Sequence, residues 1–134
     1  MSPPGEADLG RLLAGIEPVL QDGTWLYCTL AGDSIPAGFA PLATFREAEG
    51  LTLVLRQEEA ERHGLEGTFP CAWITLTVHS DLAAVGFLAA VATGLARQGI
   101  PCNAISAYHH DHLFVPKAMA AQAMATLAKF VTVT

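Results

Sequence analysis

The clearest hydrophobic pattern of the chain is an amphipathic stretch in its second half. Apolar residues recur there at helical spacing, and they are Leu82, Val85, Leu88, Ala89, Ala92, Leu95 and Ala96. This period predicts a helix over roughly residues 82–98. Ser80 or Asp81 can cap its beginning, and Gly99, followed closely by a proline, can end it, because glycine accepts the left-handed conformation that closes many helices.

Strand patterns surround this helix. Residues 72–78 alternate Ile, Leu and Val on one face with Trp and Thr on the other, which is typical of a strand buried on one side. Residues 103–108 and 113–115 predict two further strands joined by a histidine-rich turn. Residues 117–129, rich in Ala and Met, predict a second helix, and the β-branched and aromatic residues of 130–134 predict a last strand.

The resulting order is strand, helix, strand, strand, helix, strand. It is the order of the ferredoxin-like βαββαβ arrangement, an α+β fold in which both helices cover one face of an antiparallel sheet. Part of the pattern occurs twice, because a strand begins at Trp25 and again 48 positions later at Trp73. A hairpin likewise begins at Phe45 and again 60 positions later at Ile105. The first copy is therefore shorter by 12 residues, the difference between 60 and 48.

The missing residues fall where the second copy has its long helix. Residues 33–41 stand there instead, and their two Pro and one Gly permit at most a helical turn. We expect a degenerate first unit with a shortened first helix over residues 20–66 and a complete second unit over residues 70–134. An N-terminal segment, residues 1–19, should contain a short helix at 8–16 that packs on one of the copies.

The composition supports a folded chain and excludes several classes of partner. Of the 134 residues, 51% are hydrophobic and 15% are charged, which is enough apolar character for a packed core. The formal net charge of -6, with seven dispersed Lys and Arg, argues against binding to nucleic acid. No apolar run is long enough to cross a bilayer and the first residues do not form a signal peptide, so we expect a cytoplasmic protein without membrane contact.

The cysteines do not indicate chemistry. Cys28, Cys71 and Cys102 are odd in number and far apart, so buried reduced thiols fit better than disulfides or a redox pair. No His and acid are arranged in the sequence to activate Cys102. We therefore expect no catalytic residue and no cofactor.

Two segments around the long helix carry a resemblance to a known family. Residues 78–88 and 95–106 resemble, in residue type and spacing, the ACT domains that follow the kinase domain in aspartate kinases. With residues 44–51 and 108–116, the chain is also similar to small bacterial tandem-ACT proteins related to the CASTOR arginine sensors. The resemblance implies two ferredoxin-like ACT units that bind an amino acid or similar metabolite between units and regulate an enzyme partner. We expect a homodimer.

The same resemblance implies a ligand site in the second unit. Its residues come from the loop before the long helix and from the edge of the next strand, and they are His79, Ser80, Asp81, Leu82, Val85, Gly86, Asn103, Ala104 and Ile105. Many ACT domains carry a Pro-Gly pair in this loop, where this chain has Ala84-Val85-Gly86 instead. The N–H groups at a helix start favour a ligand carboxylate, Asp81 offers a counter-charge for an ammonium, and Asn103 offers a donor and an acceptor.

Each of these polar residues also has a purely structural interpretation. Ser80 and Asp81 suit simple helix capping, and Asn103 suits a bond to its own backbone at a strand start. The neighbouring run His109, His110, Asp111 and His112 has side chains that suit zinc, nickel or iron. Successive strand residues point to opposite faces, however. We therefore expect an exposed hairpin turn and no metal site, and nothing in the sequence brings the loop of His79 near it.

Two other functions stay open beside the ligand-binding module. A structural or protein-interaction module would pair through an exposed sheet edge without any ligand. A metal-binding protein or enzyme would use His109, His110 and His112. The ligand-binding module ranks first because paired units and a polar loop at a helix start occur together.

Overall fold

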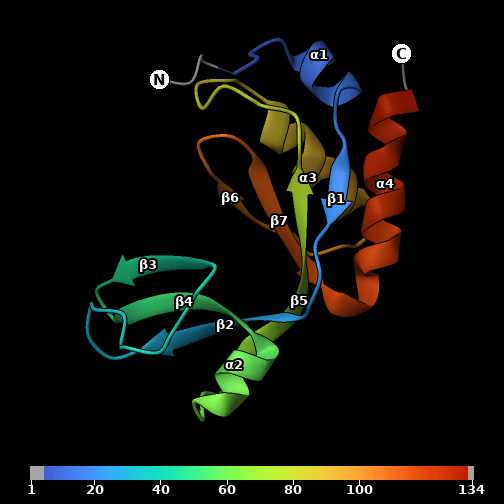
Figure 1. Cartoon of the computed structure of the whole chain (residues 1–134). Coiled ribbons are helices and arrows are strands. Elements are labelled where there is room, and N and C mark those ends of the chain that lie inside the picture. Colours follow the sequence, from blue (N-terminus) through green and yellow to red (C-terminus); the bar gives the residue numbers. More distant parts are fainter. Residues whose placement is uncertain (1–4, 133–134) are drawn as a thin grey trace.

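The computed structural model describes residues 5–132 and is built on one seven-stranded sheet (Figure 1). The strands are β1 (Pro18–Leu20), β2 (Trp25–Leu30), β3 (Ala43–Glu47), β4 (Gly50–Arg56), β5 (Thr68–Leu76), β6 (Asn103–Ser106) and β7 (Asp111–Pro116). The helices are α1 (Leu9–Ala14), α2 (Gln57–Arg62), α3 (Phe87–Arg97), the short 3-10 helix η1 (Lys117–Met119) and α4 (Ala120–Thr132). The sheet order is β3-β4-β2-β5-β7-β6, with β1 also paired to β5, and every strand pair is antiparallel. The α+β prediction is confirmed.

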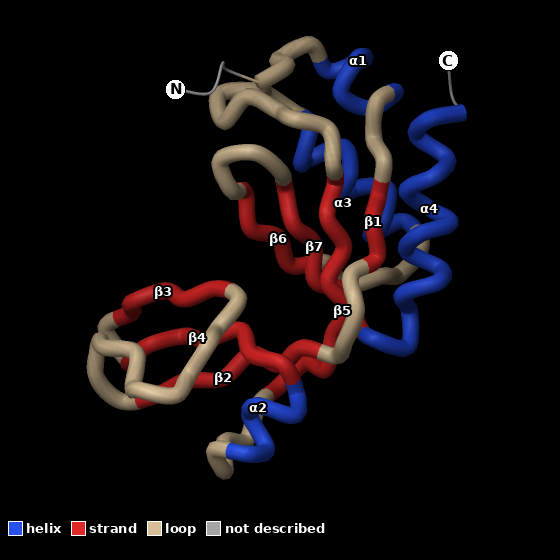
Figure 2. Tube along the Cα trace, viewed as in Figure 1, coloured by secondary structure: helices blue, strands red, loops and turns tan. Residues whose placement is uncertain are grey.

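Strand β5 is shared by the two units. Its beginning pairs with β2, with Thr68 opposite Tyr27 and Cys71 opposite Trp25, and its remainder pairs with β7 and β1. The register shifts along this pairing with β2, and Phe69 adopts a left-handed φ of 60°, a conformation that a bulky residue takes only where the surroundings demand it. In Figure 2 the strands of the first unit accordingly run across the lower end of the second unit's sheet.

Strand β1 lies where the last strand of the second unit was expected. It pairs antiparallel with β5 on the side away from β7. The prediction of a strand at residues 130–134 is wrong for 130–132, which continue α4, while 133–134 lie outside the described residues. Leu127 and Phe130 both pack into the helical core, and this helical spacing outweighs the β preference of the last residues.

Helix α3 begins later than the hydrophobic pattern predicts. Gly86, with a left-handed φ of 90°, precedes its first residue, and the buried positions are Phe87, Val91 and Leu95. The expected inward residues Leu82 and Val85 are 66% and 87% exposed. The predicted start at residue 82 is too early because the apolar spacing continues through the loop before Gly86, where these side chains are exposed. The predicted end is confirmed, since Gly99 follows the helix with a left-handed φ of 72°.

Helices cover one face of the sheet unequally in the two units. In the second unit α1, α3 and α4 enclose a core that includes Leu12 and Ile16, so the N-terminal helix packs on the second copy. In the first unit, residues 33–41 form no helix, as predicted, and the core rests on α2 through Ala60. None of the helices within residues 5–132 combines the length and apolar character that crossing a bilayer requires.

A third cluster lies on the face of the sheet that carries no helix. It unites both units through four buried residues, Trp25, Val54, Cys71 and Phe114. The rings of Trp25 and Trp73 meet edge to face at 5.4 Å between centroids. The helix-free faces of the two units therefore pack against each other through this cluster, beside the register shift between β2 and β5.

Candidate functional site

The loop after β5 and the turn before β7 lie side by side. Because β5 and β7 are antiparallel and Leu76 pairs with Asp111, the end of one strand meets the start of the other. The His79 ring lies 5.4 Å from the His109 ring and 6.3 Å from the Tyr108 ring, measured between centroids. The expectation that His79 stays away from the histidine turn is therefore wrong.

A buried carboxylate connects this loop to the β6–β7 hairpin. Asp111 is only 5% exposed, and its two oxygens accept hydrogen bonds from Ser106 Oγ at 2.6 Å and Ser80 Oγ at 3.0 Å. The prediction of an exposed turn thus holds for His109 but is wrong for Asp111, which is the first residue of β7. Asp111 and Ser106 were not predicted as members of the site, because in the sequence the aspartate stands within the run of histidines.

A small hollow opens beside Asp111, at the start of α3. Its volume is about 60 Å³, and it is lined by Ser80, Asp81, Leu82, Ala84, Phe87, Leu88, Ser106 and Asp111. Neither Ser80 nor Asp81 caps α3, because Gly86 holds that position and no side chain bonds to the first turn. One carboxylate oxygen of Asp81 instead accepts a bond from the backbone N–H of Ala83 at 2.8 Å. The capping interpretation is therefore wrong, and the first N–H groups of α3 face outward from the helix without a side-chain acceptor.

The structure divides the sequence-predicted site residues between two places. Ser80, Asp81 and Leu82 line the hollow at α3, with His79 and Gly86 in the same loop, while Val85 is 87% exposed. A separate hollow of about 300 Å³, between β6 and the first unit, is lined by Asn103, Ala104 and Ile105. Asn103 begins the strand that Ser106 ends, and three residues of strand span roughly 10 Å. Within one chain, the two halves of the predicted site do not converge.

The N-terminal segment holds the loop from the outside. Glu6 N donates to the carbonyl oxygen of His79 at 2.8 Å, and Asp81 N donates to the carbonyl oxygen of Glu6 at 2.9 Å. A Cβ atom added at Gly5 would lie 2.5 Å from the carbonyl carbon of Ser80, so the contact requires a glycine. The loop conformation therefore depends on a segment more than 70 residues away in sequence.

Burial shifts the titration of several groups near the sheet. It raises the pKa of the Cys71 and Cys102 thiols to about 11, so neither is a nucleophilic thiolate at neutral pH. Burial also raises the pKa of Tyr27 to about 12, with a further contribution from Cys71 and Cys102. Desolvation lowers the pKa of His112, and the neighbouring His110 adds to this effect, while Asp111 opposes it.

The histidine run does not form a metal centre in the described part of the chain. No group of three or more His, Cys, Asp and Glu residues within residues 5–132 is placed to hold a metal ion. The centroids of the His109 and His110 rings are 6.4 Å apart. His112, by contrast, is directed to the helix-free face, where it bonds to Trp73.

Two family models, both described as ACT domain, match the chain, one over residues 4–72 and the other over residues 68–129. A solved structure with 46% sequence identity is the Vibrio cholerae protein VC0802, described as of unknown function and as a "Possible Transport Protein". It has a TM-score of 0.82, and the alignment covers 92% of this chain and 95% of that one.

More distant structures share the fold. The Agrobacterium tumefaciens protein Atu0741 is 20% identical, with a TM-score of 0.69 and coverage of 87% of this chain and 89% of that one. The regulatory subunit of aspartate kinase from Thermus thermophilus is 11% identical, with a TM-score of 0.61 and coverage of 84% of this chain and 94% of that one. No curated protein matches the sequence.

Proposed function

Because the chain belongs to the ACT-domain family, we propose that it is a regulatory module that binds an amino acid and catalyses no reaction itself. ACT domains typically bind small ligands such as amino acids. The fold likeness to the regulatory subunit of aspartate kinase supports a regulatory role, in which the liganded module acts on an enzyme partner. The raised pKa values of the buried Cys71 and Cys102 thiols leave neither of them a nucleophile at neutral pH.

The observation that carries the proposal is that two carboxylates and an uncapped helix start lie at the same hollow beside α3. Asp111 and Asp81 place two carboxylates at its wall, where they would attract the ammonium group of an amino acid. The start of α3 has no side-chain cap, so its first N–H groups and the positive end of the helix dipole would bind the ligand carboxylate. An amino acid presents these two groups a few bonds apart.

The small volume of the hollow indicates that one chain does not enclose the ligand. Its 60 Å³ lies far below the roughly 300–1,000 Å³ of typical ligand pockets. Leu82, Val85 and Tyr108, which are 66%, 87% and 52% exposed, lie in the adjoining loop and turn. Exposed apolar side chains gathered at one end of the molecule favour contact with another protein surface. We propose that a second copy of the chain covers them, and that Asn103, Ala104 and Ile105 reach the ligand from that copy.

A thermal-shift screen against the common amino acids tests this proposal. One of them should raise the melting temperature, because a ligand at a hundredfold excess over its dissociation constant adds about 2.7 kcal/mol to stability. Asp81→Ala should abolish the shift, while size-exclusion chromatography should still show a dimer. If no amino acid or related metabolite stabilises the protein, the sensing function is wrong.

A ligand-free protein-interaction module is the second candidate, and the exposed sheet edges favour it. Strand β3 ends the sheet on one side and carries Phe45, which is 71% exposed, and β6 ends the sheet on the other side. Exposed edges of this kind seek partners. This function predicts a dimer or partner complex that forms equally well with and without every amino acid tested.

A further inference from the structure

His112 is held in one tautomer by its neighbours on β5. Its Nδ1 accepts a hydrogen bond from Trp73 Nε1–H at 3.0 Å and lies 3.1 Å from Thr75 Oγ1. An indole N–H is a donor only, so Nδ1 carries no proton. Thr75 Oγ1 in turn accepts a bond from Gln21 Nε2 at 3.1 Å, which leaves its own hydrogen free to point at His112.

The proton of the neutral ring must therefore reside on Nε2. A neutral imidazole has one donor and one acceptor nitrogen. Trp73 and Thr75 both bond to Nδ1 of His112, which is therefore the acceptor. Nε2–H of His112 has no hydrogen-bond partner among residues 5–132. The lowered pKa of His112 agrees with a ring that stays neutral, so the donor is present at neutral pH.

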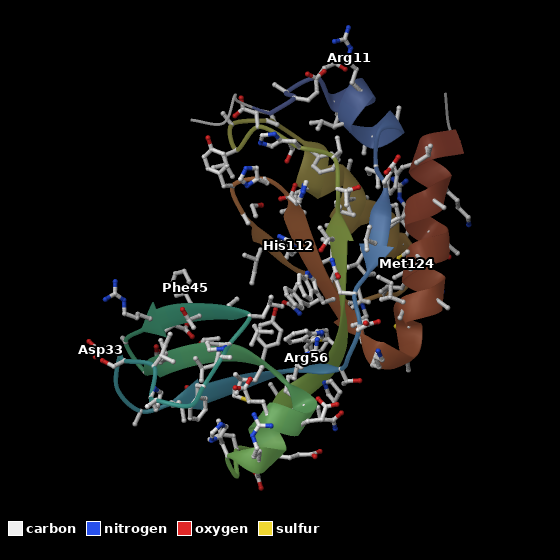
Figure 3. All side chains as sticks on the ribbon, in the orientation of Figure 1. Arg11, Asp33, Phe45, Arg56, His112 and Met124 are labelled. Carbon is white, nitrogen blue, oxygen red and sulfur yellow. The ribbon has the colours of Figure 1, made fainter. Side chains whose placement is uncertain are left out.

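The His112 side chain borders a hollow on the helix-free face. This hollow holds about 140 Å³ and is lined by Leu42, Ala43, Trp73, Ile105, Ala107, His112 and Phe114. Ala43 and Ile105 also line the neighbouring hollow of about 300 Å³, to which Tyr27, Phe45 and Val54 contribute. Figure 3 shows His112 in the second unit and Phe45 standing on β3, on the side of the first unit that faces it. The two hollows together form an inter-unit cleft.

The chemistry of the cleft selects an uncharged ligand. No Asp, Glu, Lys or Arg lines either hollow, and burying an unpaired charge there would be strongly unfavourable. The aromatic rings of Trp73 and Phe114 offer surfaces for a planar molecule. His112 Nε2–H requires an acceptor such as a carbonyl oxygen or a ring nitrogen.

We propose that the inter-unit cleft binds a small uncharged planar molecule whose carbonyl or ring-nitrogen acceptor receives the hydrogen bond of His112 Nε2. Within one chain, this site is distinct from the hollow at α3. Successive residues of β7 point to opposite faces of the sheet. Asp111 lines the α3 hollow with the helices, while His112 and Phe114 line the cleft on the other face. The chain thus has one site for a zwitterion and another for a neutral ring.

Nuclear magnetic resonance with benzamide as the probe tests the proposal on the full chain. The chain has two tryptophans, so its ¹H–¹⁵N spectrum should contain two indole signals. Benzamide should shift the Trp73 signal saturably and leave the Trp25 signal nearly unchanged. Benzoate has the same ring with a full charge and should bind about tenfold more weakly or worse.

Two variants separate binding in the cleft from general instability. His112→Phe removes the donor and should weaken benzamide binding about tenfold, although it also leaves the Trp73 N–H without its acceptor. Ala43→Phe leaves that hydrogen bond intact and should abolish the shift by filling the cleft. Ala48→Phe, at the exposed turn of the same hairpin, is the matched control and should bind benzamide like the parent chain.

Three results would overturn the proposal. The Trp73 signal would stay unchanged up to the solubility of benzamide, or benzoate would bind as tightly as benzamide. Alternatively, the signal would move with protein concentration alone while Ala43→Phe dissociated a dimer. That last pattern would identify a second copy of the chain as the occupant of the cleft.

Discussion

The two units are built on the same repeat but differ in what covers their sheets. The second unit has three helices on one face, including the 11-residue α3. The first has α2, of six residues, together with a loop where its other helix would stand. The polar site that we propose for the metabolite occurs only where the long helix is present. A helix of this length supplies both a core and an N-terminus, and the loop supplies neither.

The hairpins of the two units show the same contrast. In the first unit the strands close at Glu47 and Gly50 around a two-residue turn. In the second unit they close at Ser106 and Asp111 around a four-residue turn, so a carboxylate occupies a buried position next to α3. Asp33, the repeat counterpart of Asp81, lies at the outer end of the first unit (Figure 3) and is exposed. Its position offers no comparable pocket.

The largest expected effect tests whether the N-terminal helix belongs to the second unit. Leu12 is fully buried in the core of that unit, so Leu12→Ala should lower the free energy of unfolding by about 2–5 kcal/mol. Leu9→Ala, on the same helix but at a 38% exposed position, is the control and should lower it by less than about 1 kcal/mol. Denaturant unfolding measures both values. Equal losses would mean that α1 is not an integral part of the core.

An intermediate effect is expected at the tight turn of the first unit. Gly50 has a φ of 152°, and a Cβ atom there would lie 2.5 Å from the carbonyl oxygen of Leu30. Because that obstacle is backbone, Gly50→Ala should lower the free energy of unfolding by roughly 1–3 kcal/mol beyond the backbone strain itself. Gly32→Ala is the matched control, since Gly32 also has a positive φ, 94°, but meets nothing within 4 Å. Similar unfolding midpoints for the two variants would contradict this account.

The smallest expected effect is a pH dependence of the unfolding free energy caused by His112, which lines the cleft between the units. His112 has a pKa in the folded chain below its ordinary value of 6.5 because of desolvation. The unfolded chain therefore takes up the proton first as pH falls, and the unfolding free energy should decrease as pH drops below about 6.5. His112→Gln should show a flatter dependence between pH 7.5 and 5.5 in urea unfolding. An unchanged slope would remove His112 as the cause.

Much of the fold could be predicted from the sequence because local signals agreed with tertiary packing. The alternation of residues 72–78 marked the buried strand, and Gly99 marked the end of α3. The repeat of Trp25 and Trp73 located two copies of one strand. In each case the local sequence signal favours the same element that the packing of the core stabilises.

The remaining features depend on pairings between distant segments, which no local pattern encodes. Strand β1 has only three residues and is a strand because β5 has a free edge beside it. The site residue Asp111 was missed because its role depends on Ser80, 31 positions away. The tautomer of His112 likewise depends on Trp73, 39 positions away. Such residues can be identified in the sequence, but which of them are in contact cannot be predicted from local patterns.

Calorimetric titration with the amino acid that gives the largest thermal shift tests most directly whether the second unit alone carries the metabolite site. The account predicts one binding event per chain, loss of binding in Asp81→Ala, and unchanged affinity in the matched variant Asp33→Ala. Two binding events per chain, or loss of binding in Asp33→Ala with retention in Asp81→Ala, would contradict it.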